Sequence, residues 1–108
     1  MRTDDGADRH PVRRILTLDR TIHEPARLAL LILLASVDEA DFLYLLDETG
    51  LSRGNLSSHA SKLEQVGYIG IDKLFVDKIP RTVYRLTDAG AHALSDYRRT
   101  LVESLSSS

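Results

Sequence analysis

The sequence predicts an α+β domain that is mainly α-helical and carries one small β-hairpin. Apolar residues recur at three- and four-residue spacing before residue 66 and after residue 88, as amphipathic helices require. Between residues 68 and 86 the chain is instead rich in β-branched and aromatic residues, which favours paired strands. With 108 residues, of which 43% are hydrophobic and 28% charged, the composition fits a single globular domain.

The N-terminal part is expected to hold a charged segment followed by a short helix. Residues 1–10 show no periodicity and are predicted to be disordered, so the folded domain is expected to span residues 11–105. Pro11 suits the first position of a helix, and an apolar stripe through Ile15 continues towards Ile22. Residues 106–108 are expected to form a frayed tail.

Residues 26–37 are predicted to form a helix that is apolar on two sides. One face carries Leu28, Leu31, Ile32 and Ala35, and the other carries Leu30, Leu33, Leu34 and Val37. A helix that is apolar all round must be covered all round. It is therefore a central helix wrapped by its neighbours, or a helix with one side in the core and the other in a subunit contact; the sequence leaves both open.

Residues 42–66 are predicted to form two short helices joined by a tight turn, the helix-turn-helix arrangement. Asp41 is a candidate N-cap of the first helix, and Gly50 ends it. Ser52 is a candidate N-cap of the second helix, and Gly67 is a suitable stop. A plain helical hairpin is the alternative, because glycine-linked helix pairs are common.

The second helix of this pair has an unusual outward face. Leu56, Ala60 and Leu63 share one side, whereas the opposite side carries small polar residues. Serine is a mediocre helix former, and a helix that needed only solubility would carry Glu and Lys there. Short hydroxyl side chains allow close approach and can bond to phosphates and base edges. The candidate nucleic-acid contacts on this helix are Ser52, Arg53, Asn55, Ser57, Ser58, Ser61 and Lys62.

Several of these residues have a structural alternative. Arg53 and the serines could be no more than solvated surface, and Asn55 could be a local capping side chain. His59 lies next to the apolar face, and we expect it to be packed and hydrogen-bonded rather than to contact a ligand.

Residues 68–86 are predicted to form the hairpin, with strands over residues 68–73 and 81–86 and a turn at residues 77–80. Lys73, Lys78 and Arg81 lie near its tip and are candidate phosphate contacts. Pairing with Asp77 is the structural alternative for Arg81.

A last helix is predicted over residues 88–105. Thr87 is a candidate N-cap, and Asp88 is favourable in the first turn because it complements the helix dipole. Its apolar stripe at three- and four-residue spacing consists of Leu94, Tyr97, Leu101 and Leu105. Such a helix can pack on its own core or on a second copy of the chain.

The charge distribution separates the helix-turn-helix and hairpin from the rest of the chain. The net charge of −2 argues mildly against a nucleic-acid binder. Residues 52–85, however, carry six basic and three acidic side chains, whereas residues 1–51 carry six basic and ten acidic ones. A modest, salt-sensitive affinity for nucleic acid would follow from this local bias.

Catalysis, metal binding and membrane insertion are not expected. There is no cysteine, and the four histidines lack metal-ligand spacing. No nucleophile elbow or glycine-rich phosphate loop is present, so we expect no enzyme activity and no cofactor. The longest apolar run, residues 28–35, is too short to span a bilayer, and no signal peptide is visible, so a cytoplasmic location is expected.

Three runs of sequence carry a family resemblance that covers about residues 18–100. They are HEPARLALLILL, EADFLYLLDETGLSRGNLSSHASKLEQVGYI and PRTVYRLTDAGAHAL. Their most specific pieces are Leu51-Ser52, Asn55-Leu56-Ser57 with His59, Leu63-Glu64 with Gly67-Tyr68, and Arg81-Thr82 with Tyr84-Arg85-Leu86-Thr87 and Gly90. With these pieces, the chain resembles the compact winged-helix transcriptional regulators related to the MarR and ArsR groups.

The resemblance implies a homodimeric transcriptional regulator, a repressor, that binds a pseudo-palindromic operator in double-stranded DNA. The helix over residues 52–66 would enter the major groove, and the hairpin over residues 73–81 would be the wing that touches the backbone or the minor groove. The helix over residues 26–37 and the terminal helices would build the dimer. Its expected contact residues are Ile15, Ile22, Leu30, Leu33, Leu34, Leu94, Tyr97, Leu101 and Leu105. No constellation of residues identifies a small-molecule effector, so that question stays open.

One departure from the family pattern concerns the wing. Wings of this kind often carry a glycine and several basic residues at the tip, but here Asp77 and Ile79 stand in that region. A weaker wing contribution follows, or a wing used partly for something else. The alternative function is therefore a winged helix used as a protein–protein interaction module without strong DNA binding, which the acidic net charge also favours.

Overall fold

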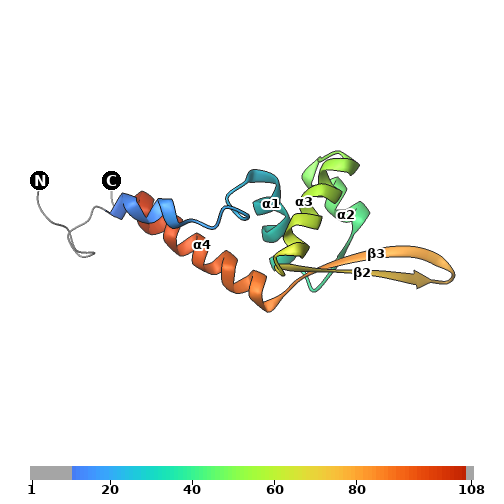
Figure 1. Cartoon of the computed structure of the whole chain (residues 1–108). Coiled ribbons are helices and arrows are strands. Elements are labelled where there is room, and N and C mark those ends of the chain that lie inside the picture. Colours follow the sequence, from blue (N-terminus) through green and yellow to red (C-terminus); the bar gives the residue numbers. More distant parts are fainter. Residues whose placement is uncertain (1–10, 107–108) are drawn as a thin grey trace, which may run out of the picture.

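The structure is a computed structural model that describes residues 11–106 of the chain. A bundle of three helices forms the body, a long helix leaves it on one side, and a β-hairpin projects on the other (Figure 1). The elements are the 3₁₀ helix η2 (Pro11–Thr17), α1 (Pro25–Ala35), β1 (Ala40–Asp41), α2 (Phe42–Thr49), α3 (Arg53–Gln65), β2 (Ile69–Val76), β3 (Ile79–Leu86) and α4 (Asp88–Ser106). The expectation for residues 1–10 lies outside the described residues, and Ser106, expected in the tail, is the last residue of α4.

The helix boundaries follow the local chemistry of their caps. The side chains of Asp41 and Ser52 accept hydrogen bonds from the backbone N–H groups of the first turns of α2 and α3, as predicted. Gly50 ends α2 in the left-handed conformation, with φ 69°, and Gly67 follows α3 with φ 83°. The capping of α1 by Glu24, whose carboxylate accepts from the Arg27 N–H at 2.8 Å, was not predicted.

The core lies between α1, α2 and α3. Its fully buried side chains are Ile22, Leu30, Leu31, Leu34, Leu45, Leu56 and Leu63. Leu31 and Leu30 belong to the two opposite faces predicted for α1, so both faces are covered within one chain, while Ile32 remains exposed. α1 is therefore a central helix that is wrapped by neighbouring parts of its own chain.

This packing corrects part of the expected subunit contact. Ile22, Leu30 and Leu34 are completely covered by the core of their own chain, and Tyr97 is buried with them, so they have no surface left for a second copy. Their apolar character correctly predicts that these residues are buried, but it does not say whether their own chain or a second copy covers them. The half-buried members of the expected set, which pack against the same core, are Ile15, Leu33, Leu94 and Leu101. Leu105 is exposed.

The sheet has three antiparallel strands in the order β1-β3-β2. β1, which was not predicted, pairs Ala40 with Tyr84 and ties the start of α2 to the hairpin. The strands of the hairpin are longer than predicted and extend from the pair Ile69–Leu86 to the pair Val76–Ile79. The turn is consequently two residues, Asp77 and Lys78, rather than residues 77–80.

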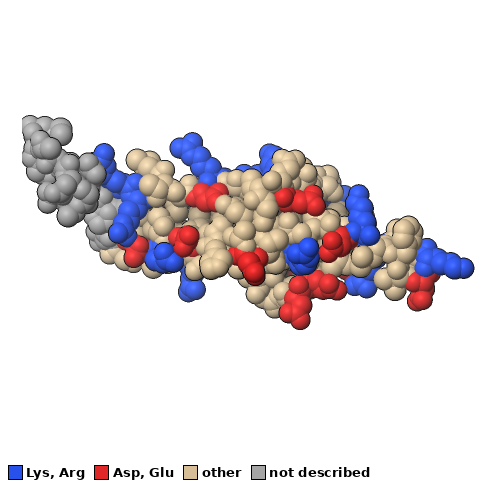
Figure 2. Space-filling model, turned by 60° about the horizontal axis from the view of Figure 1, so that its bottom comes forward, with Lys and Arg blue, Asp and Glu red and all other residues tan. Residues whose placement is uncertain are grey.

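The molecule is elongated, because the hairpin and α4 project from opposite sides of the body. Its Cα radius of gyration is 17.2 Å, compared with about 13 Å for a compact chain of this length. η2 runs back along α4 at one end, and the hairpin forms the other (Figure 1). Basic and acidic side chains are interspersed over the face in Figure 2, and both kinds also stand at the end of the projecting hairpin, beyond a mostly uncharged stretch.

Candidate nucleic-acid interface

α3 presents its polar face to solvent and its apolar face to the core. Leu56, Ala60 and Leu63 are buried, as the helical spacing predicted. The candidate contacts Ser52, Arg53, Asn55, Ser57, Ser58 and Lys62 are all exposed, and Ser61 is half-buried and accepts a 3.4 Å hydrogen bond from Gln65 Nε2. Ser52 is also occupied locally, because its Oγ accepts from the Asn55 N–H at 3.1 Å. The other exposed side chains of this face point away from the body and are available to a ligand.

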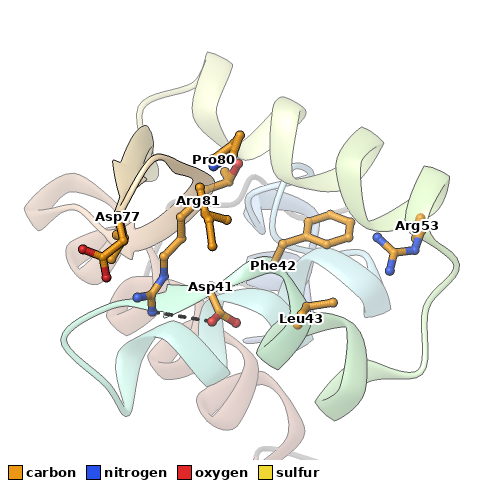
Figure 3. A pocket seen from close by; sticks show the side chains of 10 residues that line it. Asp41, Phe42, Leu43, Arg53, Asp77, Pro80 and Arg81 are labelled. Atoms are coloured by element: carbon orange, nitrogen blue, oxygen red, sulfur yellow. Dashed lines mark ion pairs between the residues drawn. The ribbon is translucent and has the colours of Figure 1, made fainter.

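Arg53 is held at the start of α3 by an aromatic ring. Its guanidinium carbon lies 5.5 Å from the ring centre of Phe42, the first residue of α2, within the range of a cation–π interaction. Figure 3 shows the two side chains facing each other across the junction of α2 and α3. This contact orients the planar guanidinium while leaving it exposed, so less freedom is lost when it binds. The sequence did not reveal Phe42 as a supporting residue, because the contact depends on how the two helices cross.

A hollow of about 620 Å³ separates the starts of α2 and α3 from the hairpin. It is lined by Asp41, Phe42, Leu43, Arg53, Val76, Asp77, Ile79, Pro80, Arg81 and Thr82 (Figure 3). Arg81 pairs across it with Asp41, its Nη2 lying 3.5 Å from the carboxylate Oδ2. Asp77, the partner considered from the sequence, does not form this pair. Both groups are partly exposed, so Arg81 is restrained by a weak ion pair and can exchange Asp41 for a phosphate.

A second hollow of about 670 Å³ lies further along α3, against the base of the hairpin. Ser57 and Glu64 contribute from α3, and Lys73 contributes from β2. Burial raises the pKa of the nearby Tyr84 hydroxyl, and the negative charge of Glu64 adds to the effect. The two hollows make the surface between α3 and the hairpin concave, with Arg53, Arg81 and Lys73 at its borders.

His59 packs between α3 and α1, as expected. Its Nδ1 lies 3.1 Å from Nη1 of Arg27, and because a guanidinium can only donate, this nitrogen is the acceptor of that hydrogen bond. Glu24 Oε1 lies 3.7 Å from the same nitrogen. This polar cluster fixes the position of α3 on α1 from the side opposite its outward face.

Within residues 11–106, no group of three or more His, Cys, Asp or Glu side chains is placed so that it could hold a metal ion. No helix in the same range combines the length and apolarity that crossing a membrane requires. The candidate nucleic-acid interface thus consists of the side chains of α3 and the hairpin named above.

A helix-turn-helix whose second helix is followed by a hairpin packed beside it defines the winged-helix class. A model of the family described as winged helix DNA-binding domain matches residues 26–105. An uncharacterised protein from Methanocaldococcus jannaschii is 31% identical over 71 residues, which cover 66% of this chain and 77% of that protein. The chain belongs to the family of winged helix DNA-binding domains.

Solved structures agree with this assignment. A transcriptional regulator homologue from Pyrococcus horikoshii is 27% identical, with a TM-score of 0.80 over 88% of this chain and 94% of that one. A transcriptional regulator of the MarR family from Enterococcus faecalis has the same fold, with a TM-score of 0.68 and 22% identity over 94% of this chain and 86% of that one. The resemblance to winged-helix regulators predicted from the sequence is confirmed.

Proposed function

We propose that this protein is a homodimeric regulator of transcription that binds a specific sequence in double-stranded DNA and acts as a repressor in the cytoplasm. The observation that carries this proposal is the outward face of α3. That face combines small hydroxyl side chains with Arg53 and Asn55 at the N-terminal turn, where helices of this type contact base edges. Membership of the winged helix DNA-binding domain family supports the same function.

The geometry suggests how the duplex would be bound. α3 has 13 residues and is about 20 Å long, and it would lie in the major groove. Arg53 is suited to a paired hydrogen bond to guanine, and Asn55 to adenine. The phosphate backbone beside the groove would pass through the concave surface between α3 and the hairpin, near Lys73. Lys78 at the hairpin tip would meet the backbone further along the duplex.

The second candidate function is a winged helix that binds another protein rather than DNA. Exposed apolar side chains near the end of the hairpin favour it, because a wing that only contacted phosphates would not need them. Ionic strength distinguishes the two functions. Binding to DNA releases counterions and falls steeply with salt, whereas an apolar protein contact does not.

The test begins with selection of duplexes by the full-length protein from a random-sequence pool at low salt. We expect a defined, two-fold related motif to be recovered, with affinity that falls steeply as salt is added. Arg53→Ala and Asn55→Ala should each cost about 1–3 kcal/mol of specific binding and relax the selected sequence. Lys78→Ala should instead weaken all duplexes similarly and lower the salt slope by about one.

Arg20→Ala is the matched control, because Arg20 is an exposed arginine in the segment before α1, outside the proposed interface. It should leave affinity for the selected duplex unchanged. Recovery of no duplex at low salt would contradict DNA binding and favour the protein-binding alternative. Equal losses for Arg53→Ala and Arg20→Ala would contradict the assignment of the reading face.

A further inference from the structure

The outer half of the hairpin carries an apolar cluster that neither the fold nor phosphate binding explains. It consists of Leu74, Phe75, Val76, Ile79 and Pro80, which we call the wing tip. Phe75 is 76% exposed and Ile79 66% exposed. The cluster lies on the part of the hairpin that projects from the body (Figure 1). β1 pairs only with Tyr84 and Val83, so among the described strands the wing tip is a two-stranded ribbon.

Cross-strand packing is the ordinary explanation for such a cluster, and it is incomplete. Phe75 lies opposite Pro80, and Val76 lies opposite Ile79, so these pairs help to hold the hairpin together. Contact with one opposite neighbour, however, leaves three quarters of Phe75 in water. Strand propensity accounts for aromatic and β-branched side chains at these positions, but it does not account for an apolar cluster left exposed to water on a projecting ribbon.

The wing tip is apolar on both faces of the ribbon. Directly opposed residues share a face and successive residues alternate, so Phe75 and Pro80 occupy one face and Val76 and Ile79 the other. A flat protein partner would cover only one of these faces. A structure that encloses the ribbon from both sides, such as a groove or an opened base step, would cover both.

The tip is also held in a fixed shape. Asp77 and Lys78 form a two-residue turn with φ values of 52° and 68°, the left-handed combination that matches the twist of paired strands. Neither residue is glycine, so the strands on either side must impose this conformation. The wing tip is therefore a stiff, narrow, apolar end rather than a flexible loop.

Charge and position identify DNA as the occupant. Lys73 and Lys78 flank the apolar cluster, and neither forms an ion pair with the residues that the structure describes. The first hollow joins Arg53 at the start of α3 to Val76 and Ile79 on the hairpin, so the wing tip continues the proposed DNA-binding surface (Figure 3). Asp77 shares the turn with Lys78, so among the described residues the charges around the cluster that lie outside ion pairs are two lysines and one aspartate. This net positive charge suits a groove in which phosphates surround stacked bases.

The geometry points to the wing tip as an apolar wedge that enters the minor groove next to α3, with Phe75 and Ile79 pressed against or between base pairs. This inference rests on the proposed function, because it requires α3 to lie in the neighbouring major groove. Apolar side chains inserted at a base step unstack it and kink the duplex by about 20–90°. The regulator would therefore bend its operator as well as recognise it, and flexible pyrimidine–purine steps would be preferred under the wing.

The experiment uses the duplex selected by the full-length protein, labelled at its two ends with a fluorescence donor and acceptor. A second set of duplexes carries 2-aminopurine at successive positions, since its fluorescence rises when the base is unstacked. At saturating protein we expect a shortened end-to-end distance and one unstacked step in each half of the two-fold motif, outside the segments covered by the two copies of α3. The double variant Phe75→Ser, Ile79→Ser should still bind but lose both signals.

Three further variants separate a wedge from a general loss of structure. Phe75→Leu keeps an apolar side chain and should retain the kink. This variant also keeps the wedge testable if the double variant loosens the hairpin. Lys78→Ala should lower affinity but keep the kink at saturation. Ile32→Ser removes an exposed apolar side chain from α1 and should change neither signal.

The outcomes distinguish failure of the wedge from failure of the proposed function. A straight, fully stacked duplex in a specific and salt-dependent complex would overturn the wedge alone. A kink that is unchanged in the double variant would also overturn it, as would a double variant that loses self-association rather than the kink. If no duplex is selected, the proposed function fails first, and the wedge fails with it.

Discussion

Tyr68 connects three separate parts of the chain. Its hydroxyl donates a short hydrogen bond to the Asp19 carboxylate, its N–H donates to the Leu63 carbonyl at 3.0 Å, and its carbonyl accepts from the Thr87 N–H at 3.1 Å. The hydrogen bond to Asp19, together with burial and the carboxylate charge, raises the pKa of the Tyr68 hydroxyl to about 12. This single residue thus fixes α3, the hairpin and the segment before α1 relative to one another.

The raised pKa predicts that stability falls at alkaline pH. The folded state keeps the Tyr68 proton between the ordinary pKa of 10.0 and about 12, whereas the unfolded state releases it. The unfolded state then binds fewer protons, so the free energy of unfolding decreases as pH rises through this window. Tyr68→Phe should remove this part of the pH dependence, measured by urea unfolding across the range.

The matched control is Tyr44→Phe, because Tyr44 is an exposed tyrosine on α2. It should leave the alkaline slope as it is in the wild type. An identical slope for wild type and Tyr68→Phe would show that the hydrogen bond to Asp19 does not retain the proton.

At the residue level, the sequence predicts contacts between near neighbours along the chain, but it does not predict contacts between residues far apart in the sequence. Ser52, Asp41 and Thr87 cap their helices as predicted, because each capping side chain and the backbone N–H that donates to it lie within three residues. The pair Arg81–Asp41 and the bond Tyr68–Asp19 join residues 40 or more positions apart. Their formation depends on the tertiary arrangement, which no sequence spacing encodes.

At the level of elements, the start of α4 is fitted directly onto the end of α3 and the hairpin. Thr87 Oγ1 donates to the Gly67 carbonyl at 2.6 Å and accepts from the Gly90 N–H at 3.0 Å. A Cβ atom added to Gly90 would lie 2.0 Å from the Tyr68 carbonyl oxygen, which belongs to the backbone and cannot rotate away. Gly90 is thus required by the close approach of α4 to the backbone of Tyr68, just before β2.

Two identical glycine substitutions should therefore change stability in opposite directions. Gly90→Ala forces α4 away from Tyr68 and should destabilise the fold by about 1–3 kcal/mol or more. Gly54→Ala, in the first turn of α3, meets no atom within 4 Å and should stabilise it by about 0.5–1 kcal/mol. Chemical denaturation measures both. A neutral or stabilising Gly90→Ala would show that α4 is not packed as closely as described.

The hairpin shows where prediction of elements from the sequence reached its limit. The alternation of Thr82, Tyr84 and Leu86 with Val83 and Arg85 predicts one strand, although Val83 and Tyr84, on opposite faces of it, are both buried. Apolar and polar residues do not alternate over Leu74, Phe75 and Val76, since both faces of the ribbon are exposed there. The predicted strand therefore ends at residue 73, whereas β2 continues to Val76. The turn was also missed, because two-residue turns of this type usually contain glycine and this one is Asp77-Lys78.

For the whole molecule, the elongated shape leaves apolar surface at both ends. The wing tip occupies one end. At the other, η2 packs along α4 and leaves Leu16 75% exposed and Val102 53% exposed, with Leu105 also exposed. Leu105 was expected in a subunit contact, whereas Leu16 and Val102 were not assigned to it. Helical spacing identified apolar stripes on both helices, but only the packing of η2 against α4 decides which members face outward.

This end of the molecule is the surface on which we expect two copies to associate. A two-fold axis here would leave both copies of α3 and the wing free. An operator with half-sites one turn of DNA apart requires the two reading helices to lie about 34 Å apart. The apolar residues at the opposite end are suited to DNA instead, because basic residues flank them. Dimerisation through η2 and α4 thus complements the proposed function without competing with it.

Leu16→Asp and Val102→Asp should therefore produce folded monomers. Burial of a leucine contributes about 1.5–3 kcal/mol, and a two-fold interface contains each residue twice, so the dimer dissociation constant should rise roughly a hundredfold or more. Sedimentation at several concentrations measures this, and affinity for a two-fold duplex should fall in parallel. Ile32→Asp, exposed on α1, is the control and should leave self-association unchanged. Monomeric wild-type protein, or a dimer that survives both substitutions, would place the subunit contact elsewhere on the chain.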